Sequence, residues 1–308
     1  MPTLTLLRPA CALTLALFAA CPLLVRAELR VIASTPDLAL VAREIGGSRV
    51  QVTALARGTE DPHFVDPKPS FVPLLRRADL LLHGGAGLEM GWLQPVLASA
   101  GNPRILPGNS GNIDCSAGID LVRESYDAID RVLADVHPRG NPHYANDPVR
   151  MKQVARTIAE AFASADAEGA PTYRETARAF GAKIDSALPR WQRALAPLRG
   201  ERVVTVHGSH TYFLERFGLA LFDTVEPRPG IPPPPGRIAG LARRMKEAGV
   251  RWVIAENFRS RKMIDALADQ AGARVVILPS IPHEWDGARD YVAFIDRCVA
   301  AFATAATP

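Results

Sequence analysis

The sequence predicts an α/β fold of two lobes, each with a parallel β-sheet, joined by one long backbone helix. Short apolar runs rich in β-branched residues alternate with helical runs, which is typical of parallel sheets. The alternation occurs twice, and one long segment with helical periodicity separates the two stretches. We therefore predict a signal peptide at 1–27, an N-terminal lobe at 28–168, a linking helix at 169–199 and a C-terminal lobe at 200–308.

An apolar segment near the N-terminus predicts export from the cytoplasm. Residues 10–25 are almost wholly apolar, Arg8 precedes them, and Val25-Arg26-Ala27 places small residues where a signal peptidase reads. Because the run is short and contains Pro22, cleavage after Ala27 is favoured over a membrane-spanning anchor, and a periplasmic location is expected. The stretch before Cys21 weakly resembles a lipobox, so a lipid anchor at Cys21 is the alternative.

The N-terminal lobe begins with a clear strand and helix alternation. Strands are expected at 29–34, 50–55 and 79–83, with a fourth at 104–106; helices are expected at 35–45, from 69–70, and from about 88. Residues 120–134 fit a strand or a helix equally well, and 137–143 form a loop of turn-forming residues. Asp147-Pro148 then begins a helix with apolar residues three and four apart.

The longest periodic segment of the chain predicts the linking helix. One apolar stripe recurs at spacings of three or four, through Tyr173, Ala177, Phe180, Ile184, Leu188, Trp191, Leu195 and Leu198. Such a helix would be about 40 Å long, enough to run along the back of two lobes. Pro189 lies inside it and is expected to kink it or to end it a turn early.

After this segment the alternation resumes. Strands are expected at 202–206, 219–223, 252–255 and 274–278, helices at 209–217, 237–248, 262–271 and near the C-terminus, and a proline-rich loop at 227–236. The net charge of +4 comes without a long basic run, so no nucleic-acid partner is indicated. Outside the signal segment only Cys115 and Cys298 remain, which is no disulfide framework.

Three histidines occupy similar short loops, two of them directly after a proline. His63 follows Asp61-Pro62, His143 follows Asn141-Pro142, and His207 ends a predicted strand. Ligands of open α/β sheets bind outside the carboxyl ends of the strands, and His63 and His207 each follow a strand, one in each lobe. The spacing matches no compact metal motif. Their position nevertheless predicts that the three imidazoles meet on one divalent metal ion, Zn2+ or Mn2+.

Several motifs resemble one known family. The three histidine motifs are Asp61-Pro62-His63 before Pro67-Lys68-Pro69-Ser70, then Asn141-Pro142-His143-Tyr144, and then Val206-His207-Gly208-Ser209. They are similar to the three successive ligand motifs of zinc/manganese receptors of ABC transporters, the cluster A-I solute-binding proteins. The strand and turn at 79–89, Glu226-Pro227 and the strand ending at Glu256 also fit. The resemblance covers nearly the whole mature chain, in order. It implies metal in a cleft between two lobes. Because the long helix resists large hinge motion, we expect small lobe and loop movements rather than wide closure.

The family's fourth ligand, often an aspartate after the last strand, has no direct counterpart. Counting along that loop reaches Ser280, and the next candidates are Glu284, His283 and Asp286, with Glu256 as an alternative from its own strand. We favour Glu284. The resemblance implies a monomeric periplasmic receptor that captures zinc, or manganese next, and delivers it to a membrane permease; it implies no catalysis.

A second class of function fits the same histidines. Three protein ligands with an open fourth position are also the pattern of a zinc hydrolase, in which Glu284 or Glu256 would act as a general base. Against this alternative, the chain has no His-Glu-x-x-His helix and no Gly-x-Ser-x-Gly elbow. A surface adhesin is a third possibility, and it depends on lipidation of Cys21.

Overall fold

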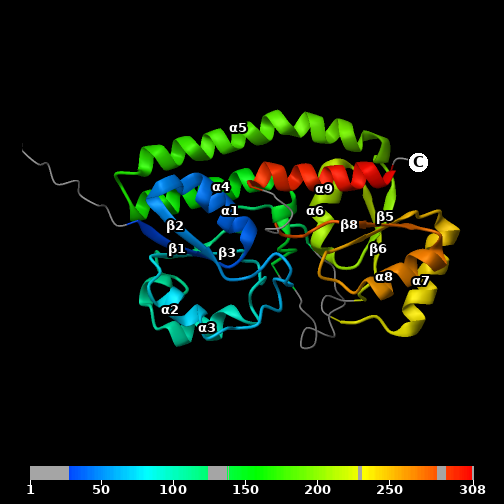
Figure 1. Cartoon of the computed structure of the whole chain (residues 1–308), viewed down its shortest axis with the longest axis horizontal. Helices are drawn as coiled ribbons and strands as arrows, with labels where there is room; N and C mark the ends of the chain where they lie inside the picture. The colour runs from blue at the N-terminus through cyan, green and yellow to red at the C-terminus, as the bar shows by residue number, and fades with distance from the viewer. Residues whose placement is uncertain (1–27, 124–136, 138, 228–230, 283–288, 307–308) are drawn as a thin grey trace, which may run out of the picture.

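A computed structural model describes residues 28–123, 137, 139–227, 231–282 and 289–306. Its two lobes lie side by side beneath one long helix, as Figure 1 shows. Each lobe is a parallel sheet with helices on both faces, so the predicted α/β architecture is confirmed.

The first sheet has the strand order β2-β1-β3-β4, and every pairing is parallel. The strands are β1 (Leu29–Ala33), β2 (Val50–Ala54), β3 (Leu80–His83) and β4 (Asn112–Asp114). The helices of this half are α1 (Pro36–Gly46), α2 (Phe71–Arg76), α3 (Leu93–Ala100) and α4 (Pro148–Ala165), with 3-10 turns η1 (Gly47–Arg49), η2 (Pro103–Ile105) and η3 (Tyr144–Asn146). Because the connections between the strands cross over through helices, the carboxyl ends of all four strands lie on the same side of the sheet, which faces the other lobe.

The strand predicted at 104–106 is wrong. Pro103–Ile105 is the 3-10 turn η2, which begins where the Asn102 side chain accepts a hydrogen bond from the Arg104 amide (3.1 Å). Ile105 is fully buried in the apolar cluster beneath α2 and α3, which explains its strand-like character. The actual fourth strand is the partly buried β4, whose residues Asn112 and Asp114 are too polar for an apolar pattern to reveal.

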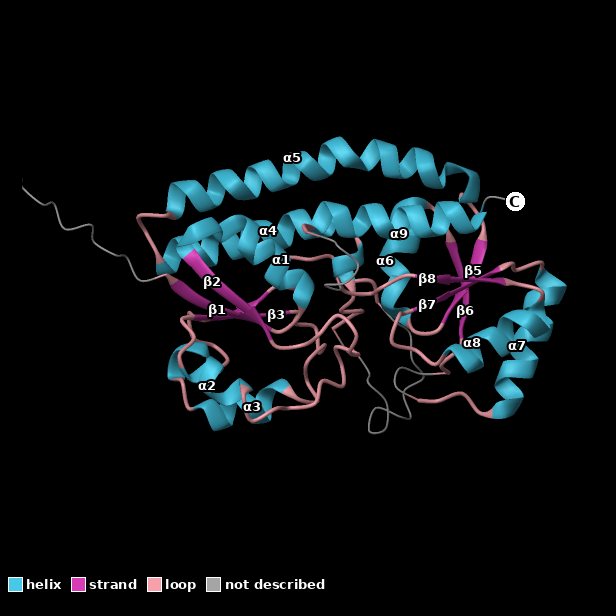
Figure 2. Ribbon diagram, in the orientation of Figure 1, coloured by secondary structure: helices cyan, strands magenta, loops and turns pink. Residues whose placement is uncertain are grey.

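The linking helix is α5 (Ala170–Leu195), continued by the 3-10 turn η4 (Ala196–Leu198). It crosses the backs of both lobes above α4 and α9 (Figure 2). The helix runs past Pro189 for six more residues, so it does not end at the proline. Its predicted stripe is buried except for the partly buried Leu188. Replacing one of the buried aromatics Tyr173, Phe180 and Trp191 with alanine is expected to cost about 3–5 kcal/mol.

The second sheet repeats the first, with the order β6-β5-β7-β8 and only parallel pairings. Its strands are β5 (Arg202–Thr205), β6 (Ala220–Thr224), β7 (Trp252–Ala255) and β8 (Arg274–Ile277). Its helices are α6 (Thr211–Phe217), α7 (Pro235–Ala248), α8 (Arg261–Ala271) and α9 (Tyr291–Ala306), with the turn η5 (Gly208–His210) before α6.

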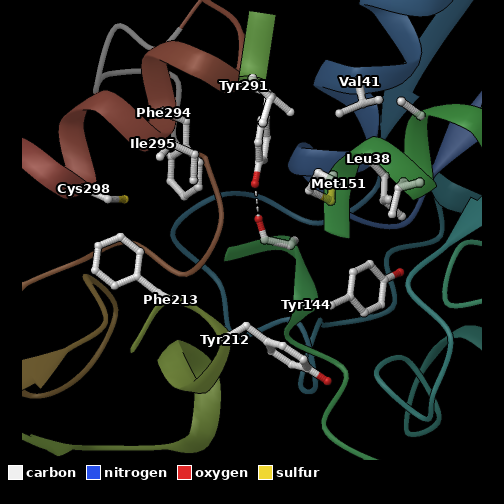
Figure 3. Close-up of a cluster of buried hydrophobic side chains, with 14 of the residues drawn as sticks. Leu38, Val41, Tyr144, Met151, Tyr212, Phe213, Tyr291, Phe294, Ile295 and Cys298 are labelled. Atoms are coloured by element: carbon white, nitrogen blue, oxygen red, sulfur yellow. Dashed lines mark hydrogen bonds between the residues drawn. The ribbon is translucent and has the colours of Figure 1, made fainter. Parts of the chain in front are cut away.

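One apolar core extends from the first lobe into the second. It joins residues of α1, α4 and α5 to residues of α6 and α9, and Figure 3 shows its middle part. There the Tyr291 hydroxyl donates to the Ala145 carbonyl (2.6 Å), so a helix of the second lobe is bonded to the turn that follows His143. This continuous core fixes the lobes firmly on the side of the linking helix.

Some sequence predictions fall outside the described residues. These are the signal segment 1–27, most of the ambiguous segment 120–134, and the loop with His283, Glu284 and Asp286. Among the helices of the described part, none is long and apolar enough to cross a membrane. Cys115 and Cys298 are buried and form no disulfide bond with each other.

Candidate metal centre

His63 lies in the loop between β2 and α2, and its own lobe holds its ring. Its backbone N–H donates to Asp61 Oδ1 (3.1 Å), which fixes the short Asp-Pro-His turn. The Trp92 indole N–H donates to the Pro62 carbonyl (2.9 Å) and fastens the loop to the start of α3. The ring Nδ1 lies 3.2 Å from the Leu88 carbonyl, so its Nε2 points towards the other lobe.

His143 lies in the loop before η3, and Asn141 orients it. The amide Oδ1 of Asn141 accepts from the His143 backbone N–H (2.8 Å) and lies 2.9 Å from the ring Nδ1. Asn141 Nδ2 donates to the Gly208 carbonyl (2.9 Å), beside His207. The completely buried Asn141 therefore fixes one histidine ring and attaches its loop to the second lobe at the same time.

His207 follows β5 directly and belongs to the second lobe. Its ring Nδ1 lies 3.1 Å from Glu226 Oε2, and Glu226 follows the neighbouring strand β6. Because parallel strands end at the same edge of a sheet, this pair of side chains needs no long loop to meet. Both residues are buried, so the contact excludes solvent.

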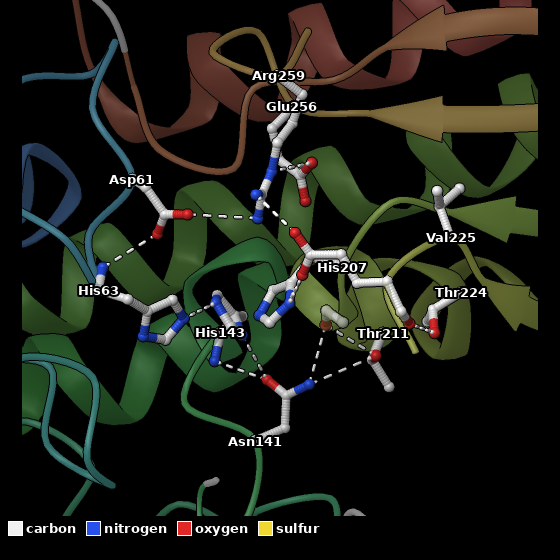
Figure 4. Close-up of polar contacts among 12 residues, drawn as sticks. Asp61, His63, Asn141, His143, His207, Thr211, Thr224, Val225, Glu256 and Arg259 are labelled. Carbon is white, nitrogen blue, oxygen red and sulfur yellow. Dashed lines mark hydrogen bonds and ion pairs between the residues drawn. The ribbon is translucent and has the colours of Figure 1, made fainter. Parts of the chain in front are cut away.

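The structure brings His63, His143 and His207 together from three separate segments (Figure 4). One ligand nitrogen from each ring lies within 4.8 Å of the others, and no other group of described His, Cys, Asp and Glu residues meets this criterion. The ring centroids are 4.9 to 5.4 Å apart. All three rings are buried, although histidine is ordinarily only moderately buried in proteins.

The hydrogen bonds determine which nitrogen of each ring carries the proton. The partner of each Nδ1 is a carbonyl, an amide oxygen or a carboxylate, and all of these only accept. Each Nδ1 therefore donates, and each Nε2 has a bare lone pair when the ring is neutral. The Nε2 atoms of His63 and His143 are 2.9 Å apart, where two lone pairs repel each other and a shared cation relieves the repulsion.

A metal ion suits this cluster better than a proton at His143. Burial and the neighbouring His63, His207 and His137 hold the pKa of His143 well below its usual range. For His207, burial lowers the pKa, but the Glu226 hydrogen bond and the nearby Glu256 outweigh it, so its pKa is raised. At His207, a proton therefore competes with a bound cation more strongly than at His143.

Of the four predicted candidates for the fourth ligand, Glu256 is the one that lies within the described residues. It lies at the end of β7, almost fully buried, and its Oε1 has no hydrogen-bond partner among the described residues. Burial alone would raise the pKa of Glu256, but His210, Arg259, His207 and Ser209 together lower it, so the side chain is a carboxylate. It does not belong to the mutually close group of ligand atoms, and its Oε2 faces Arg259 (3.4 Å).

The sequence did not identify His137 as part of the site. Its buried ring stacks on His63, with centroids 4.9 Å apart and an interplanar angle of 26°. The turn-rich run from His137 to His143 was the available signal, since a short Pro- and Gly-containing loop can bring both rings to one side. Two other histidines do not belong to the group of mutually close ligand atoms, and their Nε2 atoms have other partners. His210 Nε2 lies 3.0 Å from the Leu278 carbonyl, and His83 Nε2 lies 3.0 Å from Asn112 Oδ1.

Two parallel-sheet lobes, a long linking helix and a buried histidine cluster between the strand ends define a metal-binding solute receptor. The chain belongs to the family of the periplasmic zinc-uptake complex component A, ZnuA, whose family model matches residues 31–305. This family consists of receptors of ABC uptake systems, and it gives no support to the hydrolase alternative.

Individual relatives agree with this membership. The high-affinity zinc uptake protein ZnuA of Bacillus subtilis is 22% identical over 257 residues, which cover 82% of this chain and 79% of that protein. A zinc-bound crystal structure of a ZnuA deletion mutant is 25% identical, covers 92% of this chain and 100% of its own, and gives a TM-score of 0.75. The receptor FpvC of Pseudomonas aeruginosa with Mn2+ is 21% identical, with a TM-score of 0.76 over 91% of this chain and 98% of its own.

Proposed function

We propose that this chain binds one divalent metal ion through the Nε2 atoms of His63, His143 and His207 and delivers it to an ABC permease. One observation carries the proposal: three buried rings from separate segments turn Nε2 inward, while an acceptor oxygen fixes each Nδ1. Such Nδ1 partners are typical of metal-ligating histidines, because they fix the ring and raise its basicity.

We propose zinc as the preferred metal, with manganese second. Three imidazoles form a nitrogen-rich set that suits zinc, whereas manganese favours sites with more carboxylate oxygens. Among known relatives, one ZnuA structure carries zinc and FpvC carries manganese. The fourth ligand decides how far this preference extends; we propose Glu284, with His283, Asp286 and Glu256 as alternatives.

Metal titration against a chromophoric chelator tests the shared site. The wild type is expected to bind one equivalent of Zn2+ tightly, and the triple variant H63A/H143A/H207A to bind none. His83→Ala is the matched control, because His83 contacts Asn112 at the sheet edge and not the cluster. Tight binding that survives in the triple variant would overturn the proposed ligand set.

The fourth ligand is tested separately. If Glu284 binds the ion, Glu284→Gln weakens zinc binding by at least about tenfold, whereas Glu256→Gln does not. The reverse result would assign the position to Glu256. Wild-type zinc affinity in both variants would exclude both carboxylates and leave His283 and Asp286.

We further propose that the chain reaches the periplasm through a signal peptide cleaved after Ala27 and acts there as a monomer. A mature N-terminus at Glu28, determined by mass spectrometry of the exported protein, would support cleavage. A lipid-modified N-terminus at Cys21 would instead show anchoring. Size-exclusion chromatography with light scattering at working concentration would test the monomer.

A further inference from the structure

The two lobes contact each other on both sides of the histidine cluster, and the two sets of contacts differ in kind. On one side, the segment from Asn141 to Asp147 is bonded to η5 and α6. Asp147 is fully buried and accepts from Nε and Nη2 of Arg216 (both 2.8 Å), while the Tyr212 hydroxyl donates to the Asn141 carbonyl (2.6 Å). Asn146 Nδ2 donates to the Ser209 carbonyl (2.8 Å).

On the other side, the loop after β7 meets the loop that carries His63. Arg259 Nη2 lies 3.3 Å from Asp61 Oδ2, which joins the second lobe to the first. The same guanidinium donates through Nη1 to Glu226 Oε1 (2.8 Å) and lies 3.4 Å through Nε from Glu256 Oε2. Two residues earlier, Asn257 Nδ2 donates to the Gly58 carbonyl (3.1 Å).

Arg259 therefore contacts the immediate supports of two histidines in different lobes. Asp61 holds the backbone of His63, and Glu226 holds the ring of His207. A rigid guanidinium that bridges both carboxylates sets the separation of the two rings. The two carboxylates differ in exposure, since 16% of the Asp61 side-chain area is accessible against 0% for Asp147. Although Arg216 (28%) is more exposed than Arg259 (18%), water reaches the carboxylate only in the Asp61 contact and can replace that contact more readily.

We propose that Arg259 is an interlobe latch that positions the His63 loop against the second lobe and slows release of the metal ion. Opening the Arg259–Asp61 contact leaves the neighbouring hydrogen bond from Asn257 to the Gly58 carbonyl to hold the His63 loop, while the bonds around Asp147 and the shared core keep the lobes together. This inference rests on the proposed three-histidine site and adds a residue whose described side-chain contacts are to Asp61, Glu226 and Glu256 rather than to the three histidines.

For Arg259, charge alone makes the opposite prediction from the latch, so the Arg259 variant is the decisive one. Arg259 is a cation close to a site for a dication, so removing it would tighten binding if its charge were its only effect. Removing the anionic Asp61 would then weaken binding. In the double variant the two opposite effects on binding would sum and so partly cancel. A latch instead predicts that both single changes loosen the site, and that the double change costs little more than either one.

The experiment measures zinc dissociation by stopped flow into excess chelator, with Arg259→Gln, Asp61→Asn and the double variant. We expect each single variant to release zinc at least about tenfold faster than the wild type, and the double variant to stay within about twofold of the faster single variant. Arg261→Gln is the matched control, because Arg261 is exposed and pairs with Asp265 on its own helix. It should release zinc at the wild-type rate.

The outcomes separate the latch from the metal site itself. If wild-type protein binds no zinc, or the triple histidine variant still binds it, the proposed function fails. If the wild type binds and R259Q releases zinc no faster, or more slowly, the latch fails alone. Circular dichroism and the unfolding midpoint of the metal-free forms check folding. Should R259Q not fold, Arg259→Lys decides, because it keeps the positive charge but loses the bridging guanidinium: faster zinc release supports the latch, and an unchanged rate refutes it.

Discussion

Replacing Glu226 with glutamine tests how the site controls His207. The substitution keeps the shape of the side chain but removes the charge that faces the ring Nδ1 at 3.1 Å. A glutamine can offer either its oxygen or its amide N–H to that nitrogen, so the proton on Nδ1 is no longer enforced. Loss of such a partner typically weakens metal binding 10- to 100-fold, which corresponds to about 1.4–2.7 kcal/mol. We expect E226Q to lose zinc affinity in this range at about pH 8.

The pH dependence of E226Q should change as well. In the wild type the pKa of His207 is raised, because the Glu226 hydrogen bond and nearby carboxylates outweigh burial. Protons therefore begin to displace the metal from His207 at a higher pH than an ordinary histidine would allow. Without the charge of Glu226 that pKa falls, so the affinity of E226Q begins to drop at a lower pH. The ratio of wild-type to E226Q affinity should shrink as the solution is acidified.

Competition titrations of Zn2+ between about pH 5.5 and 8 would measure both effects. Glu247→Gln on the exposed face of α7 removes the same charge far from the rings and serves as the control. Wild-type affinity in E226Q at the upper end of this range would refute the orienting role of Glu226. A ratio that stays constant over the range would refute its effect on the His207 proton.

Two further predictions concern stability. Burial raises the pKa of Asp37 from 3.8 to about 6, so the native state loses stability as pH rises through this interval. Asp37→Asn should therefore raise the free energy of unfolding by about 2–3 kcal/mol at neutral pH and by little near pH 4. Urea denaturation of the metal-free protein at both pH values would measure this difference. Asp147→Ala leaves Arg150 and Arg216 without their buried partner and should lower the free energy of unfolding by about 3–5 kcal/mol. The exposed Asp185→Ala should lower it by less than about 1 kcal/mol and serves as the control. Equal melting temperatures of the two variants would contradict this reasoning.

Much of the fold could be predicted because the central strands contain short buried runs of apolar, mostly β-branched residues. β7 is buried throughout and β1 and β5 are buried over their last three residues, and each predicted range lies within two residues of the observed strand. The fourth strand of the first sheet could not be predicted, because β4 is three residues long, lies at an edge and pairs with β3 alone. The residues of β4 need no apolar pattern. Ile105 is apolar because it is buried in the cluster beneath α2 and α3, not because it lies in a strand.

The residues that orient the histidines were much harder to predict than the histidines themselves. Each histidine is marked locally, by a strand end or by flanking prolines. The acceptors come from elsewhere: the Leu88 carbonyl is 25 residues from His63, and Glu226 is 19 residues from His207. Only Asn141, two residues from His143, lies within reach of a local motif. A backbone carbonyl carries no sequence signature, so the Leu88 contact could be found only from the structure.

The same distinction between local and distant contacts bears on how the metal leaves. A boundary at residue 168 assigns His63 and His143 to one lobe and His207 to the other. The hydrogen bonds divide the site differently, because Asn141 and Asn146 attach the loop of His143 to the turn that follows His207. Movement between His143 and His207 must break these buried bonds, whereas movement of His63 must open the more exposed contact of Asp61 with Arg259. If release follows the less costly of these movements, His63 is the first ligand to leave the ion.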